Sequence, residues 1–358
     1  MRIDVLRPSE LTAGQRADWR AIQAGDPALG SPFLAPEWPL ACEVAGDRHV
    51  RVAVAAADGE AAAFLAVRRG PFTAMAPGAP LCDAQAVLAA PGVRVEAAAL
   101  LRALGVSRFD FTHAPAGDPV LGPGARGRTE NHYVDLSQGW ATYERELKAR
   151  KSDLLRDVRQ RTNRAAREAG PVCFTLDDPD PAAFAQMLAW KQEQYRETRQ
   201  TDVVRPAWAR RLLEQLFQTR EPGFGARLST LRIDDRLAAA HLGLYAGEVF
   251  YAWFIAHDCQ QSRHSPGMVI MTEITRALAE EGRFRAFELG PGEYPFKQRM
   301  CNANRPLAFG FIGRPSAAVL LREAEYRVRR WAEAAPLGRA SAWPGKAMRR
   351  WDVIRALG

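Results

Sequence analysis

The second half of the chain contains three apolar-rich runs separated by two-residue turn signals. The runs cover residues 225–233, 237–245 and 248–257. Asp234-Asp235 follows the first run and Ala246-Gly247 follows the second. Short runs of this kind, joined by residues that tolerate tight turns, are typical of antiparallel hairpins. The pattern therefore predicts a three-stranded antiparallel meander.

Other segments repeat their apolar residues every three to four positions, which is the spacing of one helix face. The segments with this spacing are residues 140–170, 182–197, 206–219 and 266–281. Gly170-Pro171 and Gly282 are expected to end the first and last of these helices. A strand over 285–289 comes next. We expect the helix over 266–281 to cross over, so that this strand is parallel to the last meander strand.

The first 137 residues alternate short strand-like runs with Gly and Pro. Arg51–Ala56 and Ala62–Val67 flank Asp58-Gly59, which indicates a hairpin. Residues 93–104 have helical spacing, and a strand is expected over 108–111. This part is predicted to be α+β, and it shows no defined cluster of reactive residues.

Charge changes the picture in two places. The net charge is +8. Residues 144–168 hold nine basic and five acidic residues, a net of +4, and residues 314–355 hold ten and four, a net of +6. The first segment is either a solvated helix face or a ridge that meets an anionic ligand or membrane. The second interleaves Trp331, Trp343 and Trp351 with its cations, so it either lies on an anionic membrane or docks on the protein's own body.

The remaining composition narrows the class of protein. The N-terminus lacks a signal-peptide core, and no apolar run approaches the ~20 residues of a membrane span. The five cysteines are scattered without a C-x-x-C pair, and no two histidines stand at a ligand spacing. We therefore expect a cytoplasmic protein with reduced thiols and no metal.

The loop before the helix over 266–281 is a candidate anion site. It contains Arg263 and Ser265, and Pro266-Gly267 opens the helix. The first N–H groups of a helix have no internal partner and attract phosphate. Arg263 adds a charge-assisted donor. A proline followed by glycine is also common at ordinary helix starts.

Several segments taken together resemble the bacterial cellulose-biosynthesis (CelD-like) branch of the Gcn5-related acetyltransferase (GNAT) superfamily. The resemblance covers roughly residues 20–313. It rests on Ser31-Pro-Phe-Leu-Ala-Pro-Glu-Trp38, Leu147-Lys-Ala-Arg-Lys-Ser152 with the arginine-rich segment to Gly170, Phe250-Tyr-Ala-Trp-Phe-Ile-Ala-His-Asp258, Ser265-Pro-Gly-Met-Val-Ile-Met-Thr-Glu273 and Phe287-Glu-Leu-Gly-Pro-Gly-Glu-Tyr-Pro-Phe-Lys297. Pro266 departs from the superfamily's phosphate signature, which has glycine at that position.

The resemblance implies a fold of class α/β (α+β), with tandem GNAT-like domains as in Fem-type aminoacyltransferases. Each domain would be a mixed central sheet flanked by helices, followed by a basic helical tail. The expected division is 1–137 (a degenerate copy), 138–170 (a basic connecting helix), 171–313 (the acyltransferase copy) and 314–358 (the tail). Acyl-CoA, as acetyl-CoA or a longer thioester, is the implied co-substrate, with Arg263, Ser265, Gly267 and Met268 at its phosphates. Tyr251 and Trp253 share a strand face and either line its acyl slot or belong to the ordinary core.

Acyl transfer to an amine needs a base, a donor to the oxyanion and an acid for the thiolate. Glu288 is the predicted base, or else a structural carboxylate paired with an arginine. Tyr294 is the predicted acid or substrate contact. Lys297, one of five lysines, is the predicted anion or oxyanion contact, or else a surface lysine without a role. His241 has the small same-face neighbours Ala239 and Gly243, and is either a ligand contact or a core histidine.

The leading hypothesis is N-acylation of an amine on an envelope polysaccharide precursor of the exopolysaccharide, holdfast or cellulose type. A second is long-chain acylation of a sphingoid or other lipid amine, with the tail at the inner membrane. A third is a non-enzymatic effector that binds a signalling nucleotide. Nucleic acid is not the expected partner, since no recognised motif accompanies the basic segments. Aminoacyl-tRNA as donor remains a Fem-type variant.

Overall fold

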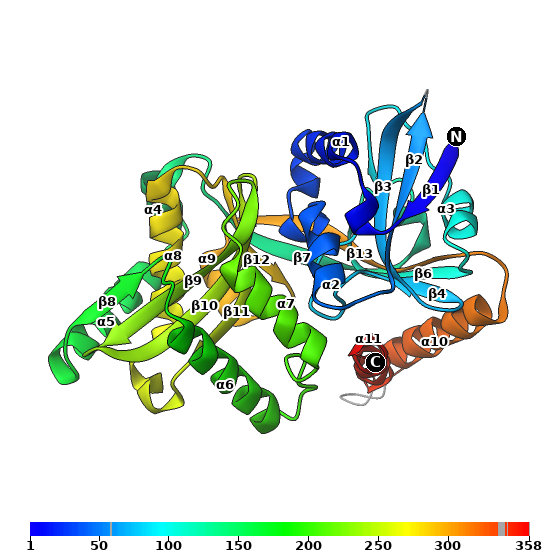
Figure 1. The fold of residues 1–358 in the computed structure, drawn as a ribbon. Helices are drawn as coiled ribbons and strands as arrows, with labels where there is room; N and C mark the ends of the chain where they lie inside the picture. Colours follow the sequence, from blue (N-terminus) through cyan, green and yellow to red (C-terminus); the bar gives the residue numbers. More distant parts are fainter. Residues whose placement is uncertain (58, 336–340, 342, 358) are drawn as a thin grey trace.

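The computed structural model describes residues 1–57, 59–335, 341 and 343–357. Within these residues the strands join in one continuous 13-stranded sheet that runs through the whole molecule (Figure 1). The strands are β1 (Arg2–Leu6), β2 (Val50–Ala57), β3 (Glu60–Arg69), β4 (Thr73–Met75), β5 (Leu88–Ala89), β6 (Arg108–Pro115), β7 (Ala125–Asp135), β8 (Val172–Thr175), β9 (Phe224–Ile233), β10 (Arg236–Ala246), β11 (Val249–His257), β12 (Ala286–Pro291) and β13 (Ala303–Gly313).

Helices flank the sheet on both faces. The α-helices are α1 (Ala13–Ala24), α2 (Glu37–Val44), α3 (Ala97–Ala103), α4 (Gly139–Ala149), α5 (Leu154–Glu168), α6 (Pro181–Glu197), α7 (Ala207–Gln218), α8 (Pro266–Glu281), α9 (Pro295–Met300), α10 (Ala317–Ala334) and α11 (Trp343–Leu357). Five 3₁₀ turns, η1 (Pro8–Glu10), η2 (Pro27–Leu29), η3 (Pro32–Leu34), η4 (Gly122–Gly124) and η5 (Cys259–His264), connect them. None of the described helices is long and apolar enough to cross a bilayer.

The strand order repeats itself in reverse about the middle of the sheet. It runs β1-β2-β3-β4-β6-β13-β7-β12-β11-β10-β9-β8. In the first half, the parallel neighbours β4 and β6 are joined through α3. In the second half, the parallel neighbours β11 and β12 are joined through α8. Two copies of one topology therefore stand back to back, which is the tandem arrangement and the mixed α/β class expected from the sequence.

The two copies exchange their last strands. β7 follows β6 in the chain but pairs with β12 of the second copy. β13 follows β12 but pairs with β6 of the first copy. The exchanged strands also pair with each other in the middle of the sheet. Because each copy is completed by the other, residues from both halves lie close together there.

The second half follows its local sequence signals closely. The meander strands β9, β10 and β11 form as predicted, and Asp234 and Asp235 both adopt the positive φ of a tight hairpin turn. The helix α8 has the predicted bounds and ends at Gly282 in the left-handed conformation. The strand after it is parallel to β11, as predicted.

Three expectations need correction. The single basic helix predicted over 140–170 is two helices, α4 and α5, because Lys151 takes a positive φ and the Ser152 N–H bonds back to Leu147 O. The helix predicted over 93–104 is shortened to α3. Pro206 lies just before α7 rather than inside it. The turn residue Asp58 lies outside the described residues.

The helices divide the second copy into two buried layers. α6 and α7 pack on one face of β9–β11 around residues such as Met187 and Leu212. α4, α5 and α8 cover the other face around residues such as Leu147, Val158 and Ile274. Each face is sealed by apolar side chains, so a ligand reaches the sheet only where strands separate.

The C-terminal tail docks on the protein's own body, beneath β4 and β6 (Figure 1). Arg322 of α10 is 4% exposed and forms ion pairs with Asp110 of β6 and Asp352 of α11. Tyr326 stacks against Phe309 and Phe311 of β13. Of the two alternatives predicted for this segment, the structure shows the one in which the tail docks on the protein's own body.

Candidate functional site

The site begins where β11 and β12 separate. These parallel strands pair only at Val249–Tyr251 and Ala286–Glu288, and then diverge. The register of β11 against β10 also shifts next to the divergence, between Leu242 and Gly243 of β10. A β-bulge re-aims the side chains that follow it. The separation leaves an opening through the sheet.

One cavity of about 940 Å³ passes through this opening. On the α8 side it is lined by His241, Met271 and Ile255, and on the α6 side by Lys191, Tyr195 and Trp253. Leu289 and Gly290 line it from β12. The cavity is therefore a passage between the two faces of the sheet, with room for an extended ligand and a second reactant.

Polar groups from both copies meet inside the passage. Asp83 belongs to residues 76–86 of the first copy, a segment that we call the crossing loop. The Tyr251 hydroxyl donates to Asp83 Oδ2 at 2.8 Å, and His113 Nδ1 lies 3.7 Å from Asp83 Oδ1. The Trp253 Nε1–H donates to Leu81 O at 3.0 Å. These contacts fix the crossing loop of one copy against β11 of the other.

Lys297 is the buried cation of the site. It lies on α9, and its Nζ donates to Gly290 O at 2.9 Å and to Pro291 O at 2.6 Å. Gly290 has a φ of +81° and no room for a Cβ, which would lie 2.5 Å from the Tyr251 hydroxyl. The strand therefore turns sharply at Gly290 and presents its carbonyls to the lysine.

The site shifts the pKa values of its titratable groups in informative directions. Burial lowers the pKa of Lys297 to about 8, although Asp83 and Glu293 oppose the shift. Burial also raises the pKa of Tyr251 well above its ordinary value, with Asp83 adding to the effect. The pKa of His113 is lowered by burial, with Asp83 opposing. Near neutral pH the pocket thus holds a lysine close to its titration point, a protonated tyrosine and a neutral histidine.

The structure brings several predicted site residues together around this passage. Lys297, Tyr294, His241, Tyr251 and Trp253 all line it. The Tyr294 ring is 55% exposed and lies 5.2 Å below Lys297 Nζ. His241 is fully buried beside Phe250 and Phe287, and burial lowers its pKa to about 3, so it is neutral. Neither of its ring nitrogens has a hydrogen-bond partner among the described residues.

Glu288 is placed differently. It is buried, and its Oε1 lies 2.6 Å from Arg305 Nη1 of β13. Burial raises its pKa and Arg305 opposes that shift. It does not belong to the residues that line the passage. The geometry corresponds to the structural alternative stated for this carboxylate, and its part in catalysis stays a prediction.

The predicted anion site lies at the other end of β11. Ser265 adopts the left-handed conformation directly before α8, and a Cβ on Gly267 would lie 3.7 Å from His257 Nδ1, an ordinary contact. Arg161 of α5 donates to Arg263 O at 3.5 Å. The Arg263 guanidinium contacts His264 at 3.0 Å and Glu168 at 3.9 Å. Part of the basic segment 144–168 thus stands beside the start of α8.

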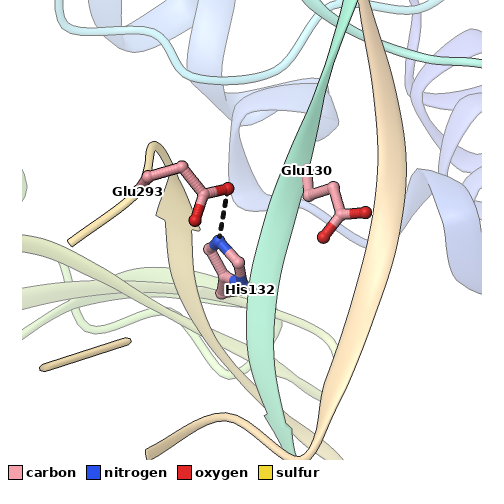
Figure 2. A group of neighbouring side chains, drawn as sticks. All are labelled: Glu130, His132 and Glu293. Carbon is pink, nitrogen blue, oxygen red and sulfur yellow. Dashed lines mark ion pairs between the residues drawn. The ribbon is translucent and has the colours of Figure 1, made fainter. Parts of the chain in front are cut away.

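A second group of ligand-type side chains lies on β7 and the loop after β12. His132 Nε2 lies 3.5 Å from Glu293 Oε1, and His132 Nδ1 lies 2.8 Å from Asn304 Oδ1. The ligand atoms of Glu130, His132 and Glu293 lie within 4.8 Å of one another. In Figure 2, a dashed line joins Glu293 to the His132 ring, and the Glu130 side chain extends from the same strand as His132. We interpret the contact as an anchor for the loop that carries Tyr294.

Sequence reasoning missed the contribution of the first copy. Asp83 and His113 of the first copy line the passage, and so do Lys191 and Tyr195 of α6, which sequence reasoning also missed. Lys191 carried one signal, the rarity of lysine in this chain. No sequence feature pointed to Asp83 or His113, because only the crossing loop and the exchanged strands bring these two residues together.

Comparison with known proteins agrees with this geometry. Residues 152–298 match the family model described as an acetyltransferase (GNAT) domain. This part of the chain is a GNAT acyltransferase domain. The match includes β11, α8, β12 and Lys297, so the parallel pair falls inside it, whereas Asp83 and His113 of the passage lie outside it. The predicted enzyme class, an N-acyltransferase, is thereby confirmed.

Solved structures share the fold across most of the chain. The C-terminal domain of a candidate lysylphosphatidylglycerol synthetase from Agrobacterium fabrum is 15% identical with a TM-score of 0.50, covering 87% of this chain and 96% of that one. A FemX structure is 10% identical with a TM-score of 0.57, covering 90% and 99%. A protein from Bacteroides thetaiotaomicron is 12% identical with a TM-score of 0.50, covering 86% and 100%. These likenesses show the fold alone. Among curated proteins, none matches the chain.

Proposed function

We propose that the protein is an acyl-CoA-dependent N-acyltransferase that modifies an amine on an envelope polysaccharide precursor. The observation that carries this proposal is the passage between β11 and β12, with Asp83, Tyr251 and Lys297 at its centre. We place the protein in the CelD-like branch, with the four segments 1–137, 138–170, 171–313 and 314–358 as its units, in the cytoplasm and peripheral at the inner membrane.

The start of α8 fits the pyrophosphate of the donor. Gly267 contributes an N–H of the first turn of α8, while the N–H groups of Ser265 and Met268 donate to Ser262 O and Ser265 O, and Arg263 and Arg161 supply positive charge beside them. From there the pantetheine would follow β11, and the thioester would enter the passage beside Tyr251 and Trp253. No acidic residue occupies the first turn of α8, and the carboxylate at the site, Glu168, lies 3.9 Å from the Arg263 guanidinium.

In the proposed reaction, Asp83 binds the acceptor ammonium and takes its proton. The neutral amine nitrogen attacks the thioester carbonyl carbon, forming the C–N bond, and the second proton that this nitrogen loses on becoming an amide passes to solvent water. The Lys297 ammonium stabilises the negative oxygen that develops there. The C–S bond then breaks, and the thiolate receives a proton from Tyr251 or Tyr294. When Tyr251 is the donor, the proton held on Asp83 returns to Tyr251 through their existing hydrogen bond, and the site is reset.

Two alternatives keep a structural argument. Long-chain acylation of a sphingoid or other lipid amine is supported by the size of the passage and by the tail, as argued in the next subsection. A non-enzymatic effector that binds a signalling nucleotide would use the cations Arg161 and Arg263. Aminoacyl-tRNA as donor would meet the same basic surface, and its binding should weaken steeply with salt.

Calorimetric titration with acetyl-CoA and palmitoyl-CoA tests the proposal. We expect binding by the wild type and at least about tenfold weaker binding by Gly267→Asp, because the new carboxylate stands at the start of α8. The substitution introduces no clash at its Cβ. Gly223→Asp, an open position in the same half, is the matched control. Equal binding by Gly267→Asp, or binding of a cyclic dinucleotide in place of either thioester, would contradict the proposal.

A further inference from the structure

The tail helices carry their apolar side chains on the outside. On α10, Leu320, Leu321, Val328 and Trp331 are exposed, Trp331 to 68%. Leu320, Ala324, Val328 and Trp331 follow one another at helical spacing, so they form a single stripe. On α11, Trp343 (70% exposed), Trp351 and Ile354 form a second stripe in the same way. We call these two sets the outer stripes.

Part of the charge of the same helices is turned inward. Arg322 pairs with Asp110, Glu325 and Asp352 while almost fully buried. Arg126 of β7 pairs with Glu323 at 2.9 Å, and Arg68 donates to Ala356 O. An ordinary surface helix buries its apolar face and exposes its charges. Here α10 buries the charged Arg322 and exposes an apolar stripe, and the contacts of Arg322 hold the helix in that orientation.

The outer stripes are bordered by cations. Arg327 and Arg330 flank the stripe of α10, and Lys346 and Arg350 flank that of α11, all four exposed. The acidic side chains of Glu325 and Asp352 form ion pairs with the buried Arg322. Tryptophan with arginine and lysine around an apolar stripe is the pattern of helices that lie in a membrane interface. We propose that the outer stripes dock on an anionic membrane surface.

Docking in this orientation brings the passage to the bilayer. Met348, Val353 and Ala356 of α11 line the same cavity that contains Asp83 and Lys297. One end of the passage therefore opens beside the helix that contacts the membrane. This inference rests on the proposed function. The geometry then assigns the acceptor to amine-bearing amphiphiles held in the membrane. These acceptors reach Asp83 from the α11 end of the passage, while the thioester enters from the α8 end.

Vesicle co-sedimentation of the full chain tests the docking. The wild type should bind vesicles of equal parts phosphatidylglycerol and phosphatidylcholine, and bind phosphatidylcholine alone at least about tenfold more weakly. The paired changes Trp331→Ser and Trp351→Ser, or Lys346→Glu and Arg350→Glu, should each lower binding by at least about tenfold. Phe72→Ser, a 74% exposed apolar residue outside the tail, is the matched control and should change nothing.

Two results would overturn the docking. One is vesicle binding that the paired variants leave unchanged. The other is a wild type that forms a dimer in sedimentation velocity without lipid, and that the tryptophan pair converts to monomer, because a second copy would then cover the stripes.

Activity separates this inference from the proposed function. With palmitoyl-CoA, the tryptophan pair should acylate water-soluble glucosamine as the wild type does, but acylate vesicle-held phosphatidylethanolamine about tenfold less. Equal rates on the vesicle amine would reject delivery through the membrane end. If the wild type acylates neither amine and binds neither thioester while vesicle binding persists, the proposed function fails and the docking stands.

Discussion

The β4/β6 and β11/β12 pairs begin alike and end differently. Both are parallel, both are joined by a crossing helix, and both pair over only a few residues before they diverge. Beyond that point, Gln85 fills the first gap: its Oε1 accepts from the backbone N–H groups of Thr112 and His113, each at 2.8 Å. Among the described residues, no such side chain crosses the second gap, and the cavity passes through it; Gln85, Thr112 and His113 line the same cavity from the first gap.

The helices that follow also differ. α8 has sixteen residues and starts behind Arg263 and Ser265, whereas α3 has seven and starts behind Glu96. A carboxylate at a helix start occupies the place that an anion would need. The second copy therefore keeps both the opening and the charge for a thioester donor, whereas in the first copy Gln85 spans the gap and Glu96 precedes the helix.

The first copy is nevertheless part of the site. The segment that closes its own gap is the crossing loop, which carries Asp83 two residues before Gln85. The crossing loop thus places Gln85 at the β4/β6 gap and Asp83 at the β11/β12 passage. A duplicated fold in which one copy has lost its cleft can still supply a reacting group, provided the sheet is continuous.

Asp83→Asn is expected to have the largest effect, because it removes the proposed base while leaving an acceptor for the Tyr251 hydroxyl. We expect kcat to fall by about 10²–10⁴-fold with little change in acyl-CoA affinity. Steady-state kinetics and the titration described above measure both quantities.

Glu288→Gln is the comparison for this prediction. Its expected effect is on folding, since Arg305 loses a buried partner. If Glu288→Gln lowers kcat in the folded protein and Asp83→Asn does not, the base lies in the second copy alone, and the first copy has no chemical role.

The second prediction concerns Lys297 and the dependence of activity on pH. Its proposed role requires the ammonium, which is lost as the pH rises through its pKa of about 8. Activity should therefore fall about tenfold per pH unit above that point. Lys297→Arg keeps its charge at higher pH, so the falling limb should move upward by more than one unit. If the falling limb of the pH–activity profile stays near pH 8 in Lys297→Arg, that limb reports the titration of a group other than Lys297.

The sequence predicted the second copy well because its signals are local. Gly282 ends α8, Asp234-Asp235 turns between β9 and β10, and the strand after α8 is parallel to β11. Each depends on residues within one turn or one supersecondary unit. Lys297, Tyr251 and Trp253 follow from the same region, and all three line the passage.

What the sequence could not predict depends on distant pairings. β13 joins β6 only through an exchange across the whole chain, and Asp83 meets Tyr251 over 168 positions. Likewise, Arg305 lies on the exchanged strand β13 and forms an ion pair with Glu288 of β12. The break at Lys151 is a local event, but nothing in its neighbours, such as a glycine or proline, announces it.

Gln85→Ala tests the difference between the two gaps with the smallest expected effect. The variant removes the acceptor of two partly buried backbone N–H groups, which should lower the free energy of unfolding by about 1–1.5 kcal/mol. Gln194→Ala, an exposed glutamine on the same passage, should change it by less than about 0.5 kcal/mol. Thermal and chemical unfolding measure both. Because Asp83 shares the crossing loop, kcat for Gln85→Ala should also fall a few-fold. A destabilised variant with undiminished kcat would show that Gln85 and the base are independent, so that the closed copy supports only the fold.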